Sequence, residues 1–212
     1  MKQKLVFVLE LLIALLAPGA WLLMVFHAHS GPLTSTGLGS IKYFTVLSNL
    51  FAGLSALIFV LAVSRGRGVS SRLLRLNLMS TAAVAVTFFT VMCFLGPLYG
   101  HRNLLQGPNL FFHLLIPLMA MLAFCLMGGE ALPRGAALPP VLCPLVYGVL
   151  YYLNICFNGV GLWPDTNDWY GFLNWGTAVG FLIFAFILLL DWLAALALLG
   201  LRSRILKKEE HT

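Results

Sequence analysis

Charged residues are scarce in this sequence. Of its 212 residues only 9% are Asp, Glu, Lys or Arg, whereas 60% are hydrophobic and the mean hydropathy is +0.94. Soluble domains carry about 25% charged residues. The composition therefore excludes a soluble domain and is typical of a polytopic membrane protein. The sequence also lacks a G-x-G-x-x-G stretch and a P-loop, which argues against nucleotide chemistry.

Cysteine is sparse as well, with four residues and no C-x-x-C pair. Cys93 and Cys156 fall near predicted outer helix ends, which leaves a disulfide between them open. Free cysteine also packs as a small apolar residue, so core positions are the simpler explanation for all four.

Apolar runs long enough to cross a bilayer occur six times, separated by Gly, Pro and charge clusters. We therefore predict an all-α fold, a single domain of six transmembrane helices over residues 1–212. The predicted spans are Leu5–Phe26, Ile41–Val63, Leu76–Leu95, Asn109–Met127, Val141–Phe157 and Phe172–Leu199. The connections between them are too short for a soluble domain, so function must reside within the helices or at their rim.

Basic residues are divided unevenly between the two sides of such a bundle. Only Lys42 and Arg102 fall on one side. The other eleven of the 13 fall on the opposite side: Lys2, Lys4, Arg65, Arg67, Arg72, Arg75, Arg134, Arg202, Arg204, Lys207 and Lys208. Cytoplasmic loops carry an excess of Lys and Arg, so we predict cytoplasmic termini in a plasma-membrane protein. The net charge of +6 then reflects topology and contact with anionic membrane lipids, not nucleic-acid binding. No feature of the sequence sets the oligomeric state.

Polar side chains inside the spans gather towards the predicted outer ends. In hydrocarbon such groups must find partners, so they face the bundle interior or a cavity. Thr45, Ser48 and Asn49 occupy positions i, i+3 and i+4 on one face of the second span. The fifth span carries a similar stripe that ends with Asn154 and Asn158. Each of these residues also has a purely structural explanation, because hydroxyls bond their own helix and Asn joins helices.

Thr45 and His113 lie four positions in from the outer ends of the second and fourth predicted spans. A helix rises about 1.5 Å per residue, so both side chains should lie roughly 6 Å below the same face and could meet. We predict a mostly apolar cavity at this level, which suits an acyl chain. Its expected aromatic wall is Phe44, Phe88, Phe89, Phe111, Phe112 and Trp175.

Two stretches of the chain resemble a known family. They are residues 42–49 (KYFTVLSN), entering the second span, and residues 109–117 (NLFFHLLIP), entering the fourth. They resemble the androgen-induced-gene and androgen-dependent TFPI-regulating protein family and its prokaryotic six-span relatives. The resemblance implies an intramembrane threonine hydrolase that cleaves fatty acid esters of hydroxy fatty acids without a metal or cofactor. Matched residue by residue, it implies Thr45 as nucleophile and His113 as base.

The chemistry suits these residue types, because a threonine hydroxyl attacks an ester once a neutral imidazole removes its proton. The oxyanion that follows needs hydrogen-bond donors. For this oxyanion and substrate layer we expect Ser48, Asn49, Asn154 and Asn158. The expected substrate is a lipid or other acyl ester. A third catalytic member, if there is one, must be Asp165 or Asp168 from the last outer loop.

A metal-dependent hydrolase is one alternative. His27 and His29 form an H-x-H pair just beyond the first span, and imidazole and carboxylate are ligands that zinc accepts. The further candidate ligands on that side are His101, His113, Asp165 and Asp168.

A transporter or lipid-binding scaffold is the other alternative. Glu10 and Asp191 lie within apolar runs, and intramembrane acids often mark ion pathways. We expect both near cytoplasmic helix ends, where they could reach the interface or pair with Lys and Arg.

We expect the loop after the second span and both termini to be closed to reagents added outside the cell. Ser70→Cys and Glu209→Cys, each in a background with the native cysteines replaced by alanine, should resist a membrane-impermeant maleimide because basic residues crowd that side. Thr34→Cys, in a loop predicted to be outside, is the control and should be labelled. Labelling of position 70 or 209 would reverse the predicted depths of Thr45 and His113.

Overall fold

Six helices of the described chain are long and apolar enough to cross a membrane. They are seen in a computed structural model that describes residues 2–26, 36–162 and 166–210. The candidate spans are Lys2–Phe26, Phe44–Ser64, Ser71–Tyr99, Pro108–Leu126, Arg134–Asn158 and Thr177–Lys208. Within the described residues the protein is all-α, so the prediction of a six-span helical membrane protein is confirmed.

Short 3₁₀ and π segments interrupt or flank the helices. The helices are α1 (Lys2–Phe26), α2 (Phe44–Ser64), α3 (Ser71–Phe89), α4 (Gly96–Tyr99), α5 (His101–Leu104), α6 (Pro108–Leu110), α7 (Ile116–Leu126), α8 (Leu142–Asn158) and α9 (Thr177–Glu210). The short segments are η1 (Leu38–Lys42), η2 (Thr90–Leu95), η3 (Phe111–Leu115), η4 (Arg134–Ala137), η5 (Pro139–Val141) and η6 (Phe172–Trp175).

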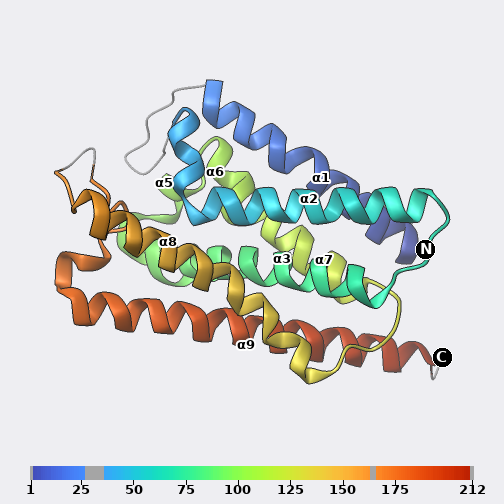
Figure 1. Cartoon of the computed structure of the whole chain (residues 1–212). Helices are drawn as coiled ribbons and strands as arrows, with labels where there is room; N and C mark the ends of the chain where they lie inside the picture. The colour runs from blue at the N-terminus through green and yellow to red at the C-terminus, as the bar shows by residue number, and fades with distance from the viewer. Residues whose placement is uncertain (1, 27–35, 163–165, 211–212) are drawn as a thin grey trace.

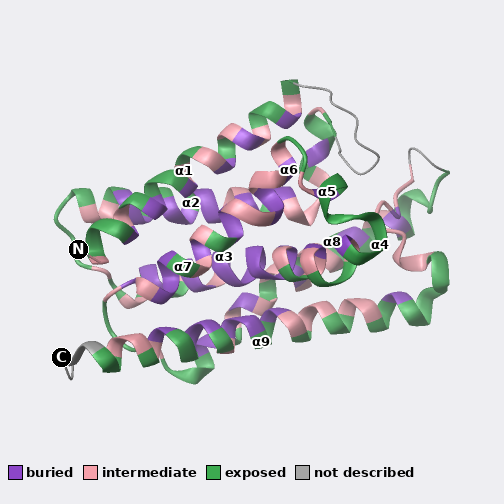
Figure 2. Cartoon of the chain, turned by 180° about the vertical axis from the view of Figure 1, so that it is seen from behind, coloured by how far each residue is buried: buried purple, intermediate pink, exposed green. Residues whose placement is uncertain are grey.

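Helix α3 lies at the centre of the bundle. It packs against α2, α7 and α9, while α1 covers α2 and α7 (Figure 1). Its residues 80–87 are all buried and mostly small, which lets the neighbouring helices approach closely. Figure 2 shows the same contrast, with buried residues concentrated on α3 and the half of α9 next to η6 largely exposed or half-buried. Both ends of the described chain lie at the same end of the bundle (Figure 1).

The second span begins later than predicted. We expected it from Ile41, but residues 38–42 form η1 and Tyr43 is extended, with φ −83° and ψ 135°. Helix α2 therefore starts at Phe44. Thr45 lies in its first turn, not one turn further in.

The sixth span is shifted in the same direction along the chain. The predicted start at Phe172 is wrong, because residues 172–175 form η6 and Gly176, with φ +87°, separates it from α9. The span also runs beyond the predicted Leu199 to Lys208. The extension carries Arg202, Arg204, Lys207 and Lys208, so Asp191 stays within the apolar part of the helix, and its place near the cytoplasmic end remains a prediction.

All four cysteines are free thiols, so the disulfide left open by the sequence is not formed. Only Cys125 is buried, while Cys93 and Cys156 are exposed. The core explanation therefore does not fit the two cysteines near the predicted outer ends.

Two π segments lie in the spans, and each ends two residues before a proline. Segment η2 closes with a bond from the Gly96 N–H to the Val91 carbonyl, and the next carbonyl in that pattern, Met92, would pair with Pro97. Proline has no N–H, so the Met92 carbonyl needs another donor. Segment η3 repeats this arrangement around Pro117, as described below.

Arg202 fastens the inner part of α9 to the end of α7. Its side chain is buried, with 2% exposed, and its guanidinium lies over the Phe124 ring at 5.9 Å. It donates to the carbonyls of Met127, Gly128, Gly129 and Glu130 over 2.9–3.1 Å. These carbonyls follow the last turn of α7, where a cation also meets the negative end of the helix dipole.

Replacing this guanidinium should destabilise the bundle. Arg202→Met should lower the free energy of unfolding by about 2–4 kcal/mol, because four backbone acceptors lose charge-assisted bonds. Titration with SDS in mixed micelles measures the change. Arg204→Met removes the same charge from an exposed position and should stay within about 0.5 kcal/mol. Equal losses in the two variants would contradict a role for the carbonyl contacts.

Candidate functional site

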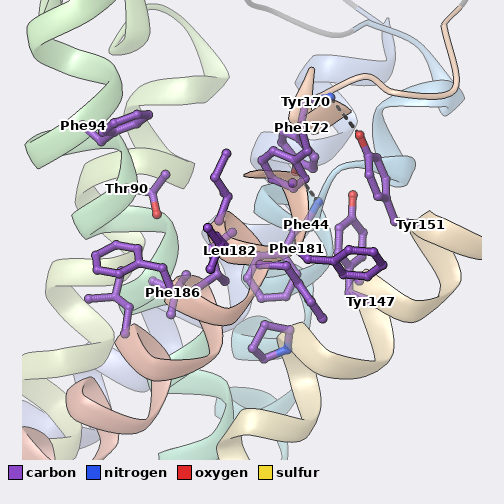
Figure 3. Close-up of a pocket in the computed structure, with 18 of the residues that line it drawn as sticks. Phe44, Thr90, Phe94, Tyr147, Tyr151, Tyr170, Phe172, Phe181, Leu182 and Phe186 are labelled. Carbon is purple, nitrogen blue, oxygen red and sulfur yellow. Dashed lines mark hydrogen bonds between the residues drawn. The ribbon is translucent and has the colours of Figure 1, made fainter. Parts of the chain in front are cut away.

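A cavity of about 1150 Å³ lies between α2, α3 with η2, α8 and α9, at the predicted outer end. Its wall is apolar apart from a few hydroxyls (Figure 3). Three of the six aromatic residues expected in the wall line it: Phe44, Phe89 and Trp175. Phe112 instead packs in the core with no exposed surface, and Phe88 and Phe111 are not among the lining residues. The cavity is therefore displaced from α7 towards α8 and α9.

The segment that follows α8 forms an aromatic roof, in which Tyr170 and Phe172 lie beside Tyr147 and Tyr151 (Figure 3). Tyr170 accepts a 2.8 Å hydrogen bond from the Phe44 N–H. Burial, with Tyr147 close by, raises the pKa of Tyr170 well above its usual value, so the phenol stays neutral. The roof is thereby joined to the first residue of α2.

Thr45 lies on the cavity wall, with Thr87 and Thr90 of the central helix on the same wall. As a residue of the first helical turn, it has a backbone N–H without an i−4 partner. Among the described residues this N–H has no hydrogen-bond acceptor, whereas those of Val46 and Leu47 both bond the Tyr43 carbonyl. A residue of the wall thus lies at the positive end of a 21-residue helix.

Asn49 ties the helix of Thr45 to the π segment of His113. Its Nδ2 donates to the Thr45 carbonyl at 2.7 Å and to the Phe112 carbonyl at 3.1 Å. The two carbonyl oxygens can therefore be no farther apart than these two bonds together. The backbone of Thr45 therefore lies close to that of Phe112, the residue before His113, but His113 is not among the residues that line the cavity.

The Phe112 carbonyl is free to accept because of Pro117. Segment η3 closes with a bond from the Ile116 N–H to the Phe111 carbonyl, so the Phe112 carbonyl would pair next with the proline nitrogen. Asn49 supplies the donor that proline lacks.

His113 is buried, and its Nδ1 lies 2.6 Å from the Leu104 carbonyl. A carbonyl oxygen only accepts, so Nδ1 carries the proton and Nε2 of the neutral ring keeps its lone pair. The hydrogen bond on one ring nitrogen sets which nitrogen of a histidine carries the proton, and here the partner is a backbone group from α5. Sequence reasoning missed it because a carbonyl has no sequence signature. Pro117 is the sequence signal next to this segment, because it has no N–H to donate to the Phe112 carbonyl.

The predicted oxyanion donors are bonded elsewhere. Both N–H groups of Asn49 are used as described, and the Ser48 hydroxyl donates to the Thr45 carbonyl and contacts the Thr87 hydroxyl at 3.2 Å. Asn158 donates to Asn154, which donates to a side chain of the roof segment. None of these four predicted residues lines the cavity.

Asp168 does not orient His113 in this structure. Its carboxylate accepts from the Tyr151 hydroxyl and from the N–H groups of Phe172 and Leu173, both at 2.9 Å. It therefore caps η6 and holds the roof. Asp165 lies outside the described residues.

The metal-ligand prediction finds only part of its residues in the described chain. His27 and His29 lie outside it. His101 Nε2 lies 2.9 Å from the Met92 carbonyl, and His113 Nδ1 is bonded to Leu104. Among the described residues no three His, Cys, Asp or Glu side chains are grouped to hold a metal ion.

Asp191 and Glu10 are both buried. Both carboxylate oxygens of Asp191 are inaccessible and have no hydrogen-bond partner within the part of the chain that the structure describes. Asp191 does not line the cavity that holds Thr45. It forms a separate polar position in the bundle.

No family model, curated protein or solved structure matches the chain.

The bridge made by Asn49 should contribute measurably to stability. Asn49→Ala should lower the free energy of unfolding by about 0.6–1.7 kcal/mol more than Asn77→Ala, the range for an interhelical hydrogen bond in a membrane. Asn77 is the matched control, because it is equally buried but donates only to Leu73 of its own helix. SDS titration of both variants gives the comparison. A smaller loss for Asn49→Ala would contradict the bridge.

Proposed function

We propose that the protein is an intramembrane hydrolase of lipid esters, with Thr45 as nucleophile and His113 as general base. The observation that carries the proposal is the Leu104 carbonyl on His113 Nδ1, which leaves Nε2 as the proton acceptor. The Asn49 bridge supports it further, because it joins the backbone of Thr45 to that of Phe112, which is next to His113. Thr45 also faces a cavity of a size and polarity that suit an acyl chain.

In the proposed reaction His113 Nε2 takes the proton of the Thr45 hydroxyl as its oxygen attacks the ester carbonyl. The alcohol leaves with that proton, and water then hydrolyses the acyl-threonine by the same steps in reverse order. No hydrogen bond joins the two side chains among the described residues. Such bonds are often loose before substrate binds and tighten in the Michaelis complex.

The backbone N–H of Thr45 is the best candidate for oxyanion stabilisation. Among the described residues it has no acceptor, it belongs to a residue that lines the cavity, and it sits at the N-terminus of α2, where the helix dipole favours negative charge. This assignment replaces the side-chain amides of Asn49 and Asn154, because neither residue lines the cavity.

We infer the class of substrate from the apolar lining of the cavity. An apolar chamber with hydroxyls on one side suits a long acyl chain whose ester lies beside Thr45. Fatty acid esters of hydroxy fatty acids have this form. We further propose that the protein acts in the plasma membrane with both termini cytoplasmic, since the basic residues crowd one side.

A transport function is the second candidate, favoured by Asp191. Among the described residues its carboxylate has no hydrogen-bond partner, and a buried, unpartnered carboxylate within an apolar span often belongs to an ion or proton pathway. The separation of Asp191 from the cavity lets the two functions be tested by different variants.

The proposed pair can be tested by substitution in the purified, reconstituted protein. Thr45→Ala and His113→Ala should each abolish labelling by a lipid-like fluorophosphonate probe and hydrolysis of a long-chain acyl ester. Residues that act as one catalytic unit are non-additive, so the double variant should be little slower than either single one. Rates in micelles and the probe signal on a gel give the two measurements.

Ser48→Ala is the matched control, because Ser48 lies one turn from Thr45 and is the rival nucleophile. It should keep labelling, and so should Asp191→Asn. If only Ser48→Ala lost labelling, Ser48 and not Thr45 would be the nucleophile. Full activity in Thr45→Ala and His113→Ala would contradict the proposed hydrolase function. Activity that is lost with a chelator and depends on His27 or His29 would favour the metal-dependent alternative.

A further inference from the structure

His101 is the only described histidine outside the spans, and the proposed reaction does not use it. Its Nε2 lies 2.9 Å from the Met92 carbonyl, the group that Pro97 leaves without a donor. Because a carbonyl only accepts, His101 Nε2 carries a proton and donates it. His101 thus does for η2 what Asn49 does for η3.

The contact is closely fitted. A Cβ on Gly96 would lie 2.3 Å from His101 Nε2, so the ring packs directly on the glycine backbone. The chain then reverses at Gly100, with φ +84°, and α5 begins at His101 itself. These features fix the first residue of α5 against η2.

Leu104 is the last residue of this single helical turn. It is buried, with 2% exposed, and its carbonyl accepts from His113 Nδ1 at 2.6 Å. Residues i and i+3 of a helical turn are held rigidly relative to each other. Anchoring His101 on Met92 therefore sets where the Leu104 carbonyl lies.

We propose that His101 is a positioning residue for His113: it anchors α5 on the Met92 carbonyl and so places the Leu104 carbonyl that orients the His113 ring. The connection runs from η2 through His101 and Leu104 to His113, over contacts of 2.9 and 2.6 Å. It rests on the proposed function only for its effect on rate. The effect on the His113 ring is independent of any activity.

The test uses His101→Ala in the full chain and reads the His113 ring directly. In protein with isotope-labelled histidine, the ring-nitrogen signals that vanish in His113→Gln should belong to a single Nδ1–H tautomer. His101→Ala should turn them into a mixture of tautomers. Hydrolysis of a palmitate ester should fall about 10- to 100-fold in kcat with KM unchanged, since orientation and not binding is lost.

Three variants separate positioning from general damage. His101→Gln retains an N–H that can reach the Met92 carbonyl and should restore the single tautomer and most of kcat. Gly96→Ala leaves His101 in the chain but places a methyl where its ring lies, and should act like His101→Ala. Arg102→Ala changes the exposed next residue and should leave both readouts unchanged.

Unchanged His113 signals in His101→Ala and in Gly96→Ala would overturn the proposal. So would a mixture of tautomers in Arg102→Ala equal to that in His101→Ala. If the tautomer shifts as expected while the wild-type protein hydrolyses no ester, the positioning role stands and the proposed function fails.

Discussion

A backbone carbonyl inside a membrane needs a hydrogen-bond donor, and two prolines of this protein remove one. Pro97 and Pro117 each follow a π segment and leave the carbonyl five residues earlier without its helical partner. An unpaired carbonyl in hydrocarbon costs several kcal/mol, so the fold must supply a side chain at each point. The donors are His101 for Met92 and Asn49 for Phe112.

These two hydrogen bonds, to the Met92 and Phe112 carbonyls, bring together the elements of the candidate site. The donor at Phe112 comes from α2, so it draws the helix of Thr45 against the segment that carries His113. The donor at Met92 comes from α5, and the carbonyl of Leu104, the last residue of α5, accepts from the His113 ring. π segments are often found at functional sites, and here the reason is visible: each exposes a carbonyl whose partner brings another element with it.

Hydropathy was enough to predict the six spans, because apolar runs of this length have few other solutions. It could not predict where a span begins. No Gly or Pro interrupts residues 41–52, yet Tyr43 is extended, so α2 starts at Phe44 and Thr45 falls in its first turn. The same limit applies to where a helix ends, since α9 continues beyond the predicted Leu199 to Glu210.

The sequence indicated a polar face on α2 but not the partner of each polar group on it. Asn49 bonds the carbonyls of Thr45 and Phe112, so it serves as a bridge and not as a free donor. Counting polar groups along a helix shows which face is polar, whereas each group's partner depends on the neighbouring helix. The orienting group of His113 is a carbonyl, which no sequence pattern distinguishes from any other. The prolines were the readable signal, because each marks a carbonyl that must be satisfied from elsewhere.

The helices of the bundle differ in how much of their length is buried, and the candidate site lies between more buried and less buried helices. In the most apolar stretch of each span, 56% of the residues are buried in the span of α3 and 50% in that of His113. The corresponding shares are 22% in the span of α8 and 28% in that of α9. His113 therefore lies among the more buried helices, while the cavity is closed by α8 and α9, whose spans are the least buried. These two helices meet closely at Gly148, where a Cβ would lie 2.0 Å from the Phe184 ring. Elements with few buried contacts open at the lowest free energy. Under the proposed function, an acyl chain from the bilayer would therefore enter between α8 and α9 without disturbing His113.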